Sequence, residues 1–142
     1  MIFSVPYKKF PDPSVSGGVS YYAAIAVGIS SPGKNSPRSK RFEAIIDSGA
    51  SNCIFHSNLG TAIGLDVPKG EPLRTLGVAG PTSVYLHDIF LYVPDGVLAI
   101  RAGFSSELPI AGLLGMNGFF DSFRITFDPT VRACTLERLH PA

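Results

Sequence analysis

One acidic side chain in this sequence stands where a carboxylate could do chemistry. Asp47 ends the apolar run of residues 42–46 and is followed by three small residues, Ser48, Gly49 and Ala50. A carboxylate delivered by a buried strand is costly to desolvate, and such side chains often have a function. Asp47 can cap the turn after the strand by accepting backbone N–H bonds. It can also act as a general acid or base, which normally requires a second group with a different pKa.

A single chain does not supply that second group, because it contains no further Asp-Ser-Gly or Asp-Thr-Gly. A twofold axis beside Asp47 would bring the Asp47 side chains of two copies together. Two carboxylates in contact share a proton and titrate as a pair, so one oxygen can activate a water molecule while the other protonates a peptide carbonyl. This chemistry requires no metal, cofactor or covalent intermediate. Gly49 would let backbone approach the pair, and the Ser48 hydroxyl could bond across the axis.

A second signal lies far downstream, where Leu113 and Leu114 precede Gly115. Together with residues 45–50, this triplet resembles the signature of retropepsin-like aspartic peptidases, and the separation of Asp47 from Gly115 is similar to the spacing in that family. The resemblance implies that Leu114 and Gly115 support the catalytic loop together with Ser48, Gly49 and Ala50. Between the two motifs the family has a hairpin flap that closes over the substrate. Its tip corresponds here to Gly77, Val78, Ala79, Gly80 and Pro81.

The resemblance covers residues 19–139 and implies an all-β fold, a closed barrel-like subunit with one or two short helices that forms a twofold dimer. It implies an aspartic endopeptidase, a homodimer whose two Asp47 carboxylates hydrolyse an extended peptide or protein substrate. The alternative is a non-catalytic peptide-binding or dimerisation module of the same fold. A monomer would have one carboxylate and could bind an extended peptide without cutting it. Residues 1–18, rich in Pro, Ser and Gly, are expected to form an extended arm before a domain of residues 19–142.

The sequence departs from the viral members of the family at several positions. Ser48 replaces the commoner Thr, and Ser51 and Met116 stand where those members typically carry an ion-paired Asp and Arg. Since both partners are absent together, no buried charge is left unpaired, and a cellular, bacterial-type relative is favoured. Ala50 removes a possible hydroxyl hydrogen bond to the ionised pair, so activity is expected at mildly acidic pH.

Strand patterns account for most of the elements that must position these residues. Strands are expected at residues 19–29, 41–46 and 53–56, and hairpins at 73–85, 87–102 and 124–138. The hairpins are marked by turn residues at Ala79-Gly80, Pro94-Asp95-Gly96 and Asp128-Pro129-Thr130. Short helices are expected at residues 57–63 and 116–122.

The composition, 45% hydrophobic and 16% charged over 142 residues, is that of one globular domain with many turns. A net charge of +1 gives no electrostatic reason to expect nucleic acid or a membrane as a partner. The basic stretch at residues 34–41 is expected to be a solvated loop. No apolar run approaches the roughly 20 residues that span a bilayer, and no signal-peptide pattern begins the chain, so a cytoplasmic protein is expected.

The remaining reactive side chains are expected to be structural. His56, His87 and His140 are scattered and do not have a metal-ligand spacing. Cys53 and Cys134 each lie among apolar residues, which favours buried free thiols over a disulfide.

Overall fold

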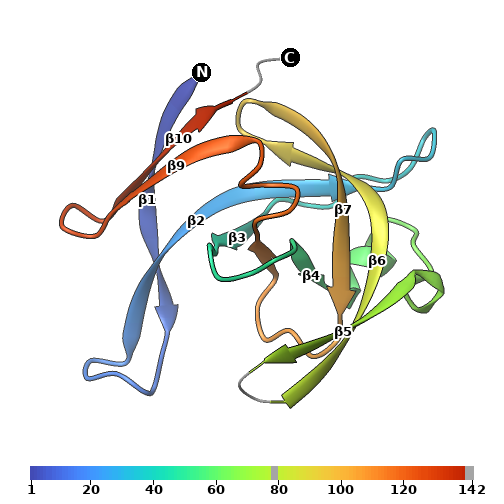
Figure 1. Ribbon diagram of the computed structural model, residues 1–142, viewed down its shortest axis with the longest axis horizontal. Coiled ribbons are helices and arrows are strands. Elements are labelled where there is room, and N and C mark those ends of the chain that lie inside the picture. The colour runs from blue at the N-terminus through green and yellow to red at the C-terminus, as the bar shows by residue number, and fades with distance from the viewer. Residues whose placement is uncertain (78–79, 140–142) are drawn as a thin grey trace.

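The computed structural model describes residues 1–77 and 80–139, and in this part of the chain the fold is mostly β with one short α-helix (Figure 1). The strands are β1 (Ile2–Pro11), β2 (Val19–Ser30), β3 (Phe42–Ile46), β4 (Ile54–His56), β5 (Glu71–Gly77), β6 (Gly80–Val93), β7 (Gly96–Ser105), β8 (Gly112–Leu114), β9 (Phe123–Asp128) and β10 (Ala133–Arg138). The helix α1 (Ser57–Ala62) lies where one was predicted, and a 3₁₀ turn follows at Val67–Lys69. No helix among the described residues is long and apolar enough to cross a membrane.

The ten strands form one sheet in the order β5-β6-β7-β4-β8-β3-β2-β1-β10-β9, and β2 pairs in addition with β6. Neighbouring strands are antiparallel except for two pairs, β3 with β8 and β4 with β7, which are parallel. The side chains of β2, β3 and β8 that face inward include Val27, Ile29, Ala44 and Leu114, all fully buried. The β3–β8 pairing therefore brings the two sequence motifs side by side in the centre of the molecule.

The three predicted hairpins are present. β5 pairs with β6 as far as Gly77 and Gly80, while Val78 and Ala79 lie outside the described residues. β6 and β7 are joined by the two-residue turn Pro94-Asp95. β9 and β10 form the last hairpin. Local turn chemistry was therefore sufficient to predict these antiparallel pairs.

The N-terminal segment, predicted to be an extended arm, is a strand of the sheet. Residues 2–6 pair with β10, and residues 7–11 pair with β2. Phe3 and Val5 pack against the core, and the Phe3 ring meets Phe123 edge-on with 6.1 Å between ring centroids. The first strand of the chain is thus held by its own last strand. The predicted domain boundary after residue 18 stays a prediction.

The helix predicted at residues 116–122 is wrong, because the chain makes successive turns there. Gly118 has a φ of 101°, a left-handed conformation that an α-helix does not contain. Asp121 stabilises this turn by accepting the Gly118 N–H at 3.1 Å. The turns bury Phe119 and Phe123, whose ring centroids are 5.0 Å apart. Core packing of the aromatic rings therefore takes the place of helical hydrogen bonding in this segment.

Candidate active site

Asp47 lies at the point where β3 leaves the centre of the sheet. The parallel register pairs Ile45 with Leu113 and Ile46 with Leu114. The pairing continues for one more bond, in which the Asp47 N–H donates to the Leu114 carbonyl at 2.9 Å. Asp47 is half-buried while Ile46 and Leu114 are buried. The carboxylate is therefore carried by hydrogen-bonded backbone at the boundary between the buried core and the exposed loop.

The turn after β3 uses one oxygen of the Asp47 carboxylate. Oδ1 accepts the Gly49 N–H at 2.8 Å, and the Ala50 N–H donates to the Asp47 carbonyl at 3.2 Å. Among the described residues, the structure gives the other oxygen, Oδ2, no hydrogen bond. The capping role predicted as one interpretation is therefore present, and it leaves one oxygen open for chemistry. Ser48 and Gly49 are exposed beside it.

The loop that follows Asp47 packs directly on Gly115. The Met116 N–H donates to the Ala50 carbonyl and the Asn117 N–H to the Ser51 carbonyl, each at 2.8 Å. A Cβ atom on Gly115 would lie 2.4 Å from the Asn52 carbonyl oxygen and 2.7 Å from that of Ala50. Since these neighbours are backbone atoms, only glycine fits. Four predicted site residues, Asp47, Ala50, Leu114 and Gly115, thus share one hydrogen-bonded unit.

Gly115→Ala is expected to displace the Asp47 loop, because the added methyl group meets backbone that cannot rotate away. We expect a loss of about 2 kcal/mol or more in the free energy of unfolding, measured by urea denaturation. Gly28→Ala is the matched control, since a Cβ there has its nearest neighbour, Arg38 Nε, at 3.6 Å, an ordinary contact. Equal stability of the two variants would contradict the close packing at Gly115.

The predicted flap corresponds to the β5–β6 hairpin. Its described backbone pairs Leu76 with Pro81 and Gly77 with Gly80, so the hairpin reaches the predicted tip. Val78 and Ala79, the remaining residues of that tip, lie outside the described residues. In Figure 1 the described parts of β5 and β6 lie side by side at the lower edge of the view.

Cys53 is a residue of the site that sequence reasoning missed. It was predicted to be a buried free thiol, and it is one. In addition, its sulfur accepts the Gly115 N–H at 3.4 Å and its thiol donates to the Asn117 carbonyl at 3.6 Å. Burial raises the pKa of the Cys53 thiol to about 11. Its nearness in sequence to Asp47 was the one available signal, and the contact with Gly115 depends on the parallel β3–β8 pairing.

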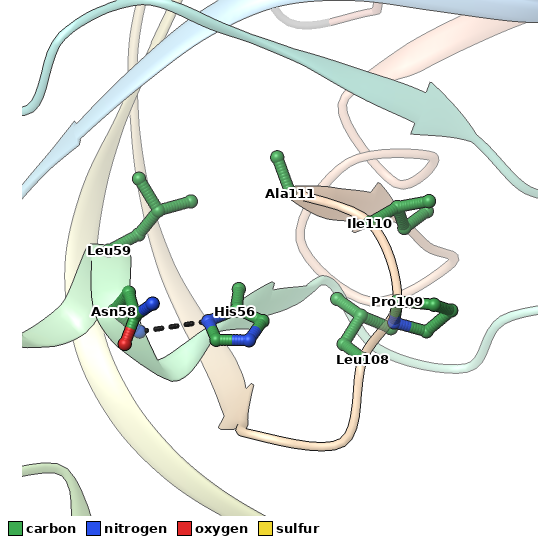
Figure 2. A pocket seen from close by; sticks show the side chains of 7 residues that line it. All are labelled: His56, Asn58, Leu59, Leu108, Pro109, Ile110 and Ala111. Carbon is green, nitrogen blue, oxygen red and sulfur yellow. Dashed lines mark hydrogen bonds between the residues drawn. The ribbon is translucent and has the colours of Figure 1, made fainter. Parts of the chain in front are cut away.

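His56 and His87 have structural contacts, as predicted for them. His56 Nδ1 accepts the Asn58 N–H at 3.1 Å and caps α1 (Figure 2). The same ring lines a pocket of about 360 Å³, opposite residues 108–111. His87 Nε2 donates to the Val67 carbonyl at 2.9 Å. His140 lies outside the described residues. His56 and His87 thus hold neighbouring elements together.

Comparisons with known proteins place this geometry in a fold. No family model and no curated protein matches the chain. Among solved structures, a retropepsin-like aspartic protease from Rickettsia conorii matches with a TM-score of 0.60 and 15% identity, over 93% of this chain and 99% of that one. The EIAV protease in complex with the inhibitor HBY-793 matches with a TM-score of 0.50 and 13% identity, over 66% of this chain and 81% of that one.

The chain therefore has the retropepsin-like fold, which confirms the resemblance predicted from the sequence at the level of the fold. The bacterial structure matches over more of the chain than the EIAV structure does. At these identities the similarity concerns architecture, and the chemistry has to be argued from the residues of this chain.

Proposed function

We propose that this protein is an aspartic endopeptidase that acts as a homodimer and hydrolyses peptide bonds through a water molecule activated by two Asp47 carboxylates. The observation that carries the proposal is the position of Asp47. In a retropepsin-like fold, its carboxylate stands at the end of β3, its loop is locked on Gly115, and its Oδ2 has no hydrogen bond among the described residues.

The proposed dimer places a twofold axis beside the Asp47 loop, because one chain contributes one Asp47. Ser48 and Gly49 are exposed there, and Met116, which bonds to the loop through its N–H, has 47% of its surface exposed. An exposed methionine next to a glycine-containing loop suits an apolar contact between subunits. The pairing of β1 with β10 inside one chain supports an interface that does not require exchange of termini. The β2–β6 pairing supports the predicted closed, barrel-like subunit.

The proposed mechanism follows from two carboxylates in contact. They share one proton, because two negative charges at this distance repel each other strongly. The ionised carboxylate takes a proton from water as the water attacks the scissile carbonyl, and the other carboxyl protonates the carbonyl oxygen. The substrate would bind as an extended strand under the two β5–β6 flaps, with alternate side chains on opposite sides. The predicted tip of each flap is Gly77, Val78, Ala79, Gly80 and Pro81.

Incubation of the purified chain with a diverse peptide library between about pH 3 and pH 7 tests the proposal, since carboxylates titrate across that range. Sedimentation in the same buffers measures the subunit number. We expect a dimer that cleaves peptides, with the highest rate at mildly acidic pH. A dimer that binds peptides and cuts none would contradict the proposal and favour the non-catalytic peptide-binding module.

A further inference from the structure

We infer that Cys53 is a positioning residue for Asp47. Its thiol joins the loop of residues 47–52 to residues 115–117 and thereby fixes the position of the Asp47 carboxylate relative to the proposed twofold axis. The inference rests on the proposed function, because it concerns the geometry of the same site. It assigns a role in the reaction to a side chain that touches no substrate.

Both hydrogen bonds of the thiol go to residues 115–117, the segment that is bonded to the Asp47 loop. Cys53 follows immediately on the Asp47 loop, and its own carbonyl accepts the Gly103 N–H from β7 at 2.8 Å, which anchors its backbone in the sheet. From this anchored position the sulfur accepts from Gly115 N–H at 3.4 Å, and the thiol donates to the Asn117 carbonyl at 3.6 Å. One side chain thus satisfies a backbone donor and a backbone acceptor two residues apart.

Without the thiol, the buried donor on Gly115 would have no acceptor among the described residues. An unsatisfied buried N–H is costly, so the segment would shift to find water or another acceptor. The Gly115 segment is bonded to the Asp47 loop through Ala50 and Ser51, and Asp47 itself is bonded to Leu114. A shift of Gly115 would therefore be passed directly to the carboxylate.

The protonation state of Cys53 suits this role. A pKa of about 11, raised mainly by burial, keeps the group a neutral thiol over the acidic range in which the peptidase is expected to work. A neutral thiol is both a donor and an acceptor, whereas a thiolate could only accept. Cys53 is also fully buried, so its sulfur acts through packing and hydrogen bonds.

Cys134 provides a matched control within the same chain. It is equally buried, it is free, and burial raises its thiol pKa to about 11 as well. In the described part of the chain its sulfur has no hydrogen bond. It lies in β10, whereas Cys53 adjoins the Asp47 loop. Substitution of Cys134 therefore measures the effect of losing a buried thiol on packing, without the loss of a hydrogen bond.

The test compares Cys53→Val with Cys53→Thr, which have the same shape but differ in the hydroxyl group that can replace the thiol, and adds Cys134→Val. We expect kcat of Cys53→Val to fall about 10-fold to 100-fold, as for a small misplacement of a catalytic group, with little change in KM. Cys53→Thr is expected to recover most of kcat, and Cys134→Val to keep it. Thermal unfolding of each variant separates these effects from a general loss of stability.

Amide hydrogen exchange at Gly115 gives a second readout that does not depend on activity. We expect faster exchange in Cys53→Val than in Cys53→Thr or Cys134→Val. If the parent cleaves peptides and the Val and Thr variants of Cys53 have the same kcat, the inference is overturned and the proposed function stands. If the parent cleaves nothing, the proposed function fails, and equal exchange rates at Gly115 in all variants would then overturn the positioning role separately.

Discussion

Asp47→Asn is expected to reduce peptide cleavage by about 1,000-fold or more while leaving the fold and the dimer intact. The reduction is in the range that general acid–base catalysis contributes, and here one substitution changes both members of the pair. Asparagine has nearly the shape of aspartate and can still accept the Gly49 N–H through its amide oxygen, so the turn that uses Oδ1 is preserved. Initial cleavage rates and sedimentation measure the two effects. Asp66→Asn, at a carboxylate with 61% of its side chain exposed, is the control and should cleave at the parental rate.

Mixing the parent with Asp47→Asn tests whether the pair is built from two chains. When subunits exchange freely, a threefold excess of the variant leaves only about a quarter of the parent chains paired with another parent chain. Activity per parent chain should therefore fall to about a quarter. Unchanged activity per parent chain would mean that one subunit suffices, and would contradict the shared pair.

Asp95→Ala is expected to be the most destabilising substitution of a charged residue, with a loss of about 3 kcal/mol in the free energy of unfolding. Asp95 sits in the β6–β7 turn, and its Oδ2 lies 3.5 Å from Nε of Arg138 in β10. The side chains are 3% and 8% exposed, and the guanidinium also lies over the Phe123 ring at 5.2 Å. Removal of Asp95 leaves a positive charge buried without its partner, which is why the cost is large.

Urea denaturation at a fixed protein concentration measures this cost, because subunit association would otherwise change the apparent stability. Asp95→Asn keeps the turn preference and removes only the charge, so it separates the ion pair from the turn. Glu137→Ala breaks a surface ion pair with Arg124, whose side chains are 39% and 68% exposed, and should cost less than about 1 kcal/mol. Similar losses for Asp95→Ala and Glu137→Ala would contradict the importance of burial.

The local parts of the site could be predicted from the sequence, because their chemistry is written in consecutive residues. An apolar run ending in Asp47 predicted a strand that presents a carboxylate, and β3 ends at Ile46. Turn residues such as Pro94-Asp95-Gly96 predicted hairpins. A family resemblance predicted that the Leu114-Gly115 pair supports the loop. The structure gives the reason for the glycine: a Cβ atom on Gly115 would lie only 2.4 Å from the Asn52 carbonyl oxygen.

Other features depended on contacts between distant segments, which a single sequence does not display. Residues 2–11 have turn-forming and polar neighbours, but they are a strand because β10 and β2 offer free edges on either side. Residues 116–122 have the length of a short helix, but the burial of Phe119 and Phe123 and the positive φ of Gly118 favour turns.

By itself, the sequence determined where the carboxylate and the hairpins lie, since turn chemistry and strand periodicity act over a few residues, and a family resemblance pointed to the glycine of the site. Only the tertiary structure decided that the first strand pairs with the last and that Cys53 bonds to Gly115. It also decided that Asp95 is buried against Arg138. The parallel pairing of β3 with β8 and the antiparallel pairing of β1 with β10 close long loops. The conformational entropy lost in closing these loops is offset only when the rest of the core packs, so the contacts depend on the whole fold.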